Sequence, residues 1–211
     1  MTVGVHGNAK EERIARILDA TLEVLTEFSL ADATTGEIAA RARISKRDLY
    51  AFFPTKQALL MGVIVREMQS QDRSFREIIA RTAKLRSLRS KLDVIGEALV
   101  EDMLSPTMGM VRRLVISESL KQPFLGNLFF EGGVAQRCKL IGEVLASHQS
   151  KATATKRAEA DWAAERYFSL VGYFPSIMTE IGMRSEWSEN AIKKHVSAAT
   201  EIFLKAHSSF D

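Results

Sequence analysis

The pattern of hydrophobic and polar positions is helical along the whole chain. Segments such as AKEERIARILDATLEVLTEF repeat apolar residues at steps of three and four, which is the period of one face of an α-helix. Stretches in which apolar and polar residues alternate are rare, and only 4 prolines and 12 glycines interrupt the 211 residues. The pattern therefore predicts an all-α protein.

The periodic segments predict where the helices lie. Residues 1–8 lack periodicity and are expected to form a disordered tip, and the first helix is expected over 9–28. Two short helices follow at 35–42 and 46–52, and a long fourth helix starts at Lys56 and runs to about residue 80. Further helices are predicted at 88–104, 107–121, 124–149, 154–182 and 187–208.

Capping residues mark the starts of the early helices. Thr35, Ser45 and Thr55 can each accept a hydrogen bond from the free amides of a following first turn, so we predict them as N-caps. Pro54 ends the third helix, because proline disfavours a helical conformation in the residue before it.

The two short helices need a partner, because neither can bury much surface alone. The apolar stripe over 14–28 supplies a third helix against which they can pack. Ile38 and Ala39 on one short helix, Ile44 at the turn and Leu49 on the other would meet in this small core, with Ala39 small because the helices cross closely. This is the packing of a helix-turn-helix, whose second helix enters the DNA major groove.

Charge supports a nucleic-acid partner through its distribution more than through its total. The formal net charge is only +3. Between positions 41 and 56, however, five basic residues stand with a single acid, Asp48; the five are Arg41, Arg43, Lys46, Arg47 and Lys56.

Lys46 and Arg47 open the predicted recognition helix, at the end that reaches base edges. Arg47 can pair with guanine O6 and N7, and Lys46 can serve a base or a phosphate. Asp48 can accept from a cytosine amino group or pair with a basic residue of its own helix. Thr35, Tyr50 and Lys56 are predicted phosphate contacts, which set the register on DNA without reading sequence.

At these positions the sequence resembles the TetR family of transcriptional regulators. The family pattern combines a Thr pair, an acidic-Ile-Ala triplet, a turn, Leu-Tyr-x-x-Phe and a Lys that opens the fourth helix. The chain matches it without a gap over roughly 10–60, at Thr34-Thr35, Glu37-Ile38-Ala39, Ile44-Ser45, Leu49-Tyr50, Phe53 and Lys56. Two positions depart from the family pattern in ways that matter for structure or DNA contact. Arg43 stands where the family usually has Gly, and Gly36 lacks the side chain with which some relatives contact a base.

The resemblance implies a helix-turn-helix DNA-binding domain at 9–56 and a larger helical domain for ligand binding and dimerisation at 57–211. It also implies a homodimer formed through the last two helices, about 154–208. Gly172 and Pro175 are expected to weaken or kink the first of these two. Both carry apolar stripes; one holds Trp162, Leu170, Val171, Phe174, Ile177, Met178 and Ile181, and the other Trp187, Ile192, Val196, Ala199 and Phe203.

A pocket for an apolar small molecule is expected among the Met and aromatic residues of the middle helices, although such residues are often plain core. The candidate lining residues are Met103, Met110, Phe124, Phe129 and Tyr167. Glu118 is either a polar anchor in this pocket or a surface partner of Lys121.

No catalytic, metal or cofactor motif is present in the sequence. The four histidines are scattered, and no phosphate-binding Gly-rich loop or G-x-S-x-G motif occurs. Cys138 is alone, which excludes an internal disulfide and is typical of a small hydrophobe in a helix rather than a redox sensor. No apolar run has the length of a signal peptide or membrane span, so a cytoplasmic protein without a membrane partner is expected.

The sequence therefore predicts a non-enzymatic regulator that binds double-stranded operator DNA as a homodimer. The resemblance favours a repressor that a small-molecule ligand releases from its operator, with the fourth helix as the lever. The alternatives are a ligand-independent helix-turn-helix protein and an activator of the same fold.

Overall fold

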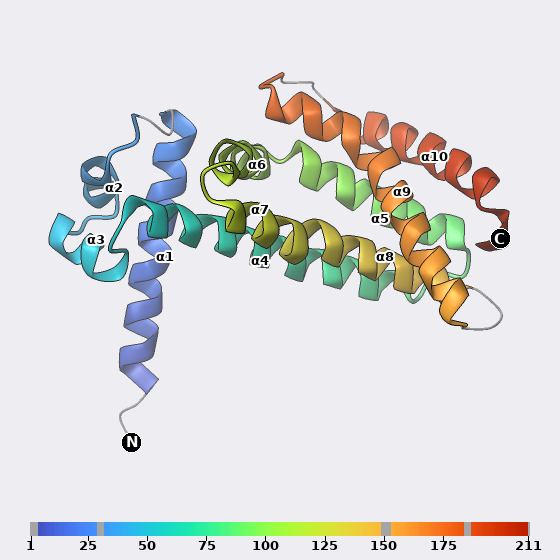
Figure 1. Cartoon of the computed structure of the whole chain (residues 1–211), viewed down its shortest axis with the longest axis horizontal. Coiled ribbons are helices and arrows are strands. Elements are labelled where there is room, and N and C mark those ends of the chain that lie inside the picture. Colours follow the sequence, from blue (N-terminus) through green and yellow to red (C-terminus); the bar gives the residue numbers. More distant parts are fainter. Residues whose placement is uncertain (1–3, 29–31, 149–152, 184–186, 211) are drawn as a thin grey trace. The chain divides into compact units, whose positions relative to one another are not determined.

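A computed structural model describes residues 4–28, 32–148, 153–183 and 187–210, and within these residues every regular element is helical (Figure 1). The predicted all-α class is confirmed. The elements are α1 (Gly4–Glu27), α2 (Thr35–Arg41), α3 (Lys46–Phe52), α4 (Lys56–Thr82), α5 (Leu88–Leu104), α6 (Pro106–Ser119), α7 (Pro123–Phe129), the π-helix η1 (Phe130–Ala135), α8 (Gln136–Ala146), α9 (Ala154–Glu180), α10 (Glu189–Ala206) and the 3₁₀-helix η2 (Ser208–Phe210).

The chain folds into two compact units, Met1–Glu67 and Met68–Asp211. Their division falls inside α4, so this one continuous helix contributes residues to both units. The boundary expected from the sequence, between 56 and 57, lies at the first turn of the same helix.

Helix α1 begins at Gly4, so the predicted disordered tip is wrong for residues 4–8, while residues 1–3 lie outside the described part of the chain. No proline lies between Gly4 and Ala9, and helix propagation from the strongly periodic segment that follows costs little once a helix is nucleated.

The N-cap of α2 is Thr34 and not Thr35, which corrects the sequence-based assignment. Thr34 has an extended backbone, and its hydroxyl accepts from the Glu37 amide at 3.1 Å. Thr35 is therefore the first helical residue, which leaves its hydroxyl available for another contact. The other two predicted caps are confirmed: Ser45 Oγ accepts from the Asp48 amide and Thr55 Oγ1 from the Ala58 amide, each at 3.0 Å.

The first unit is built around the apolar face of α1. Helix α1 packs on α2 and α2 packs on α3, and Ile38, Ala39 and Leu49 are buried as predicted. Ile44 is only half-buried. Phe28, the last residue of the predicted stripe, is 44% exposed because α1 ends one residue earlier.

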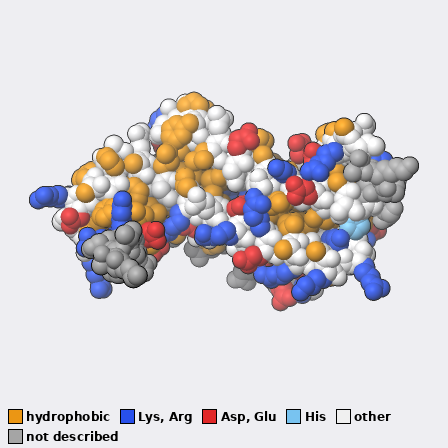
Figure 2. Space-filling model, turned by 90° about the horizontal axis from the view of Figure 1, so that it is seen from below, with side chains coloured by type: hydrophobic (Ala, Val, Ile, Leu, Met, Phe, Trp, Pro, Cys, Tyr) orange, Lys and Arg blue, Asp and Glu red, His pale blue; other side chains and the backbone are white. Residues whose placement is uncertain are grey.

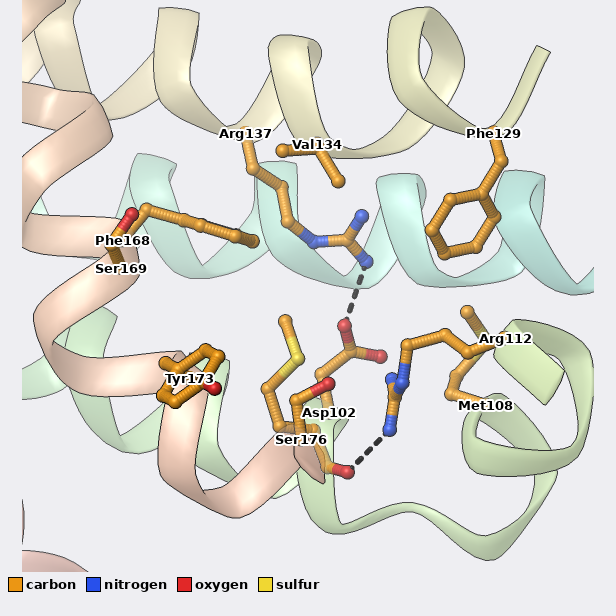
Figure 3. Close-up of a pocket in the computed structure, with 12 residues that line it drawn as sticks. Asp102, Met108, Arg112, Phe129, Val134, Arg137, Phe168, Ser169, Tyr173 and Ser176 are labelled. Atoms are coloured by element: carbon orange, nitrogen blue, oxygen red, sulfur yellow. Dashed lines mark hydrogen bonds and ion pairs between the residues drawn. The ribbon is translucent and has the colours of Figure 1, made fainter. Parts of the chain in front are cut away.

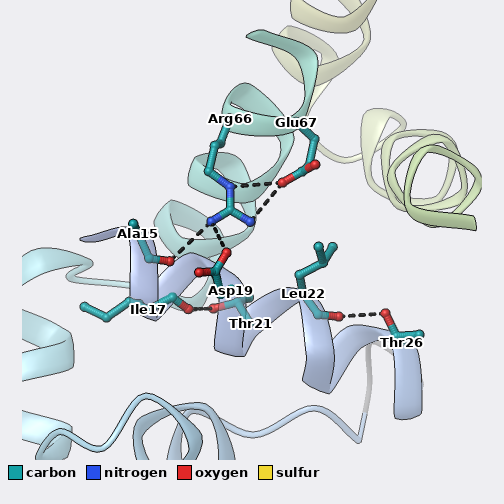
Figure 4. Close-up of polar contacts among 8 residues, drawn as sticks. All are labelled: Ala15, Ile17, Asp19, Thr21, Leu22, Thr26, Arg66 and Glu67. Carbon is teal, nitrogen blue, oxygen red and sulfur yellow. Dashed lines mark hydrogen bonds and ion pairs between the residues drawn. The ribbon is translucent and has the colours of Figure 1, made fainter. Parts of the chain in front are cut away.

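Polar contacts within the first unit tie α4 to α1 (Figure 4). Arg66 Nη1 donates to Asp19 Oδ1 at 2.7 Å and to the Ala15 carbonyl at 3.2 Å. The Arg66 Nε also donates to Glu67 Oε1 at 3.0 Å, so a single guanidinium joins both helices.

The core of the second unit is shared by α5, α8, α9 and α10. Val196, Ala199 and Phe203 of α10 and Val171 of α9 lie in this core. The expectation that these stripe residues face a second chain is wrong, because they are needed to close the core of their own chain. Other stripe residues point outward, namely Trp162, Leu170, Phe174 and Ile181.

The predicted helix over 124–149 consists of α7, η1 and α8, which follow one another without a break. The π-helical segment inserts an extra residue into the helical ladder, a feature that occurs often at functional sites. It contains Gly132 and Gly133, and a Cβ at Gly132 would lie 3.0 Å from Met68 Cε on α4.

Helix α9 runs through Pro175, where the sequence predicted a weakened or kinked helix. Proline has no N–H to donate to the carbonyl of Val171. His195 of α10 fills this vacancy, since its Nε2 donates to the Val171 oxygen at 2.9 Å. Within the described residues, no helix is both long and apolar enough to cross a membrane.

Candidate DNA-binding surface and candidate ligand pocket

The turn between α2 and α3 is formed by a strained arginine. Arg43 has φ of 55°, the left-handed conformation in which a non-glycine residue costs about 1 kcal/mol. Two hydrogen bonds hold it, from the Arg43 amide to the Ala40 carbonyl at 3.1 Å and from the Ile44 amide to the Ala39 carbonyl at 3.0 Å. Arg43 therefore adopts at this turn a backbone conformation that glycine adopts without strain.

Helix α3 presents one polar face to solvent. Lys46, Arg47 and Tyr50 are exposed, whereas Leu49 is buried beneath them. The side chain of Lys46 lies across Gly36, where a Cβ would come within 2.9 Å of Lys46 Cε. The glycine thus makes room for a lysine from the neighbouring helix.

Two predicted phosphate contacts meet in the structure. The Thr35 and Tyr50 hydroxyls lie 3.1 Å apart and share a hydrogen bond between α2 and α3. Lys56 begins α4 directly after the Thr55 cap. The hydroxyl pair lies between two helices of the DNA-binding motif, where it can orient Tyr50.

Asp48 has a structural partner, which explains an acid on this otherwise basic face. Its Oδ2 accepts from Ser45 Oγ at 2.7 Å, and the same hydroxyl accepts from the Asp48 amide. This reciprocal pair closes the N-terminus of α3.

Sequence reasoning missed two arginines near the turn. Arg13 and Arg16 of α1 line an open groove of about 380 Å³ together with Arg43 and Asp48. Their spacing of three residues on one helix was the available signal, but only the fold brings them beside the turn. Arg41, by contrast, is tied to Glu27 by a 2.7 Å hydrogen bond and is half-buried, so it adds little free positive charge.

Figure 2 shows acidic side chains interspersed with the basic ones over the right-hand part of one face. The small net charge is therefore not concentrated into a single positive field on that face.

The second unit contains a cavity of about 200 Å³ beneath η1 and beside α9 (Figure 3). Two of the five predicted pocket residues, Met103 and Phe129, line it. Tyr167 is fully buried in the core, where its hydroxyl donates to the Leu92 carbonyl at 2.6 Å. Phe124 is 47% exposed, and Met110 is buried but is not part of the lining.

Glu118 lies 3.9 Å from Lys121 Nζ, which is the surface ion pair that the sequence offered as one of its two alternatives. Cys138 is buried, and burial raises the pKa of its thiol to about 11.

Charged groups that the sequence did not single out lie inside the cavity wall. Asp102 Oδ2 is 3.1 Å from Arg137 Nη2, and both side chains are almost fully buried. Burial raises the pKa of the Asp102 carboxyl, with the two nearby arginines opposing this shift. From the sequence alone, charged residues in the middle of a helix, such as these two, are predicted to lie on the surface. Their burial depends on how several helices pack around them.

A second arginine completes this network. Arg112 Nε lies 3.0 Å from Glu180 Oε1, and its Nη2 donates to the Met103 carbonyl at 2.6 Å. Ser176 Oγ donates to the same glutamate at 2.6 Å. In Figure 3 the Asp102 carboxylate lies between the two guanidinium groups.

The geometry defines a class of protein, a helix-turn-helix DNA-binding regulator with a second helical unit that holds a partly enclosed cavity. Residues 17–63 match the bacterial regulatory proteins of the tetR family, and residues 90–208 match the AefR-like transcriptional repressor C-terminal domain. The second match covers more than half of the chain. The chain belongs to the TetR family of transcriptional regulators.

Individual relatives agree with this assignment. The chain is 26% identical to the HTH-type transcriptional repressor KstR of Rhodococcus jostii over 198 residues, which cover 93% of this chain and 85% of KstR. A TetR-family regulator from Mesorhizobium loti has the same fold, with a TM-score of 0.82 at 18% identity over 93% of this chain and 96% of that one. The flavonoid-responsive regulator FrrA follows with a TM-score of 0.65 at 24% identity, over 93% and 97% of the two chains.

Proposed function

We propose that this regulator is a repressor that leaves its operator when a small molecule occupies the cavity of the second unit. The cavity wall carries the proposal: it combines an apolar lining with a buried Asp102–Arg137 pair, the composition of a ligand site rather than of a plain core. Members of the family bind operator DNA, dimerise and bind small-molecule effectors. The name of the matched C-terminal family and that of KstR support repression, and we infer that the protein acts by binding and not by catalysis.

On DNA we assign base reading to Lys46 and Arg47, and phosphate contact to Thr35, Tyr50 and Lys56. The exposed face of α3 supports the first assignment, and the shared hydrogen bond of Thr35 with Tyr50 supports the second.

Helix α4 is the proposed route from cavity to DNA-binding unit, because it contributes residues to both units. Two contacts join it to the cavity wall. The Arg137 guanidinium lies over the Phe75 ring of α4 at 5.7 Å from its centroid, and Gly132 of η1 lies against Met68. A ligand that moves Arg137 therefore moves a group packed on α4.

The homodimer is proposed to form through α9 and α10, which leave an apolar groove open to solvent. Leu170, Tyr173 and Ile202 line this groove together with His207. Tyr173 and Ile202 are 71% and 58% exposed and line the same groove, and a contiguous exposed apolar surface of this kind is typical of a protein–protein interface.

DNA-binding anisotropy tests the proposal, with the duplex upstream of the protein's own gene compared with a scrambled duplex over a salt series. We expect binding that prefers the upstream duplex and falls steeply with salt. Arg47→Ala should lose this preference, corresponding to about 1–3 kcal/mol. Lys139→Ala is the control, since Lys139 is exposed on α8, outside the proposed interface helices, and this variant should bind as the parent chain does. Equal, weak binding of both duplexes by parent and variant would contradict the proposal.

A further inference from the structure

The starting observation is one carboxylate oxygen in the cavity wall. The Asp102 side chain is only 9% exposed, and its Oδ2 is paired with Arg137. Among the described residues, its Oδ1 has no hydrogen-bond partner although it is fully buried, and the Nε atoms of Arg112 and Arg137 in the same wall have none either. Buried polar atoms without partners are unfavourable, and in native proteins a water, an ion or another bound group usually completes them. A hydroxyl group can donate to the carboxylate oxygen and accept from a guanidinium N–H.

The size and lining of the cavity limit what this group can belong to. A cavity of about 200 Å³ is slightly larger than the roughly 150 Å³ cavity that holds benzene in an engineered protein. Five of its twelve lining residues carry aromatic or Met side chains, which pack well against an aromatic ring. They are Met103, Met108, Phe129, Phe168 and Tyr173.

The charges around the cavity already balance. Arg112 is paired with Glu180 and Arg137 with Asp102, so the two guanidinium groups face two carboxylates. A charged ligand would place an uncompensated charge in a mostly apolar, partly enclosed site, which is costly. A neutral ligand that donates a hydrogen bond satisfies Asp102 Oδ1 and keeps the balance.

We propose that the cavity takes a neutral, single-ring aromatic molecule whose hydroxyl group donates to Asp102 Oδ1. This inference rests on the proposed function and specifies the chemical class of its effector. The ring fills the apolar part of the cavity, and the hydroxyl supplies the donor that the carboxylate lacks.

Three probes of matched ring size test the chemistry by isothermal titration calorimetry on the full chain. They are p-cresol, whose hydroxyl donates, 4-methylanisole, whose ether oxygen only accepts, and p-toluate, which is an anion. We expect p-cresol to bind at least about tenfold more tightly than either of the others, since a hydrogen bond to a charged group contributes roughly this factor or more.

A variant isolates the carboxylate. In Asp102→Asn the amide oxygen faces Arg137, so an N–H group replaces the free acceptor. The preference for p-cresol over 4-methylanisole should fall to about threefold or less, because both probes can accept from that N–H. Asp93→Asn is the matched control on the same helix: Asp93 also has a buried oxygen without a hydrogen-bond partner in the described structure, but it does not line the cavity. It should keep the parent preference.

A second variant covers the case in which Asp102→Asn fails to fold. A Cβ at Gly172 would lie 3.5 Å from Met103 Cγ, an ordinary contact, so Gly172→Ala should fold while narrowing the cavity. We expect it to weaken p-cresol binding several-fold.

The outcomes separate this inference from the proposed function. If 4-methylanisole or p-toluate binds as tightly as p-cresol and weakens operator binding, the hydroxyl inference is wrong and the ligand-released repressor stands. If p-cresol alone binds but leaves operator affinity unchanged, the site assignment holds and release by ligand is wrong. If no probe binds at millimolar concentration, the inference is overturned, while operator reading is still judged by Arg47→Ala.

Discussion

At the residue scale, the space around two glycines of the second unit decides whether each can be replaced by a larger residue. A Cβ at Gly96 of α5 would lie 2.5 Å from Val196 Cγ1 and 2.6 Å from the Tyr167 hydroxyl. That hydroxyl is fixed by its hydrogen bonds to the Leu92 carbonyl and Thr200, so it cannot move aside without loss. Gly96 is therefore a packing requirement, whereas Gly172 borders the cavity.

We predict opposite effects on stability for the two alanine substitutions. Gly96→Ala should lower the free energy of unfolding by about 1–3 kcal/mol through overpacking. Gly172→Ala should raise it by about 0.5–1 kcal/mol, because alanine is favoured over glycine inside a helix. Urea unfolding followed by circular dichroism measures both, and a loss of stability in Gly172→Ala would contradict the account of the cavity.

The buried thiol of Cys138 predicts how the stability of the chain changes at alkaline pH. Burial raises its pKa from 9.0 to about 11, so the folded chain holds the thiol proton where the unfolded chain loses it. The stability that this group contributes is present below pH 9 and is lost as pH rises toward 11. Cys138→Ala should therefore lose less stability between pH 9 and 11 than the parent chain in urea titrations at each pH. Parallel curves for the two chains would refute it.

At the element scale, the short helix α3 depends on its capping pair. Seven residues cannot form a stable helix in isolation, so the Ser45–Asp48 pair and the buried Leu49 hold it in place. Similarly, α9 continues past Pro175 because His195 of a neighbouring helix supplies the missing donor. In both cases contacts outside the backbone ladder complete the helix.

Ser45→Ala should therefore loosen α3. We expect a loss of about 1 kcal/mol in the free energy of unfolding, typical of a lost N-cap, together with weaker operator binding. Ser45→Thr keeps both the acceptor for the Asp48 amide and the donor to the Asp48 carboxylate, and should restore much of the stability. Chemical unfolding and DNA anisotropy test the set. Full operator affinity in Ser45→Ala would show that the cap does not position the recognition helix.

At the scale of the whole molecule, the outward face of α9 and α10 is the proposed homodimer interface. Ile202→Glu places a charge in the apolar groove and should weaken the homodimer at least tenfold, measured by sedimentation velocity across a dilution series. Operator affinity should fall with it, because two half-sites are read by two chains. Ile116→Glu is the matched control, since Ile116 of α6 is equally exposed at 58% and lies outside the groove. A dimer that survives Ile202→Glu would place the interface elsewhere.

Local sequence signals were enough to predict the helices and part of the candidate DNA-binding surface. Periodicity predicted most helices within a few residues, and the family resemblance singled out Arg43, whose positive φ the structure then showed. The cap of α2 was displaced by one residue, since Thr34 and Thr35 are chemically identical and only the backbone conformation distinguishes them.

The sequence by itself determined the helical class, the helix-turn-helix and the exposed basic residues of its second helix, because these depend on spacing along one chain segment. Tertiary structure alone decided that Val196 and Phe203 close their own core, that Arg13 lies beside the turn, and that Asp102 meets Arg137 in a buried cavity. These facts depend on which helix faces meet. A charged residue in mid-helix has the same local pattern on a surface as in a pocket, and its burial is set by packing between helices distant in the sequence.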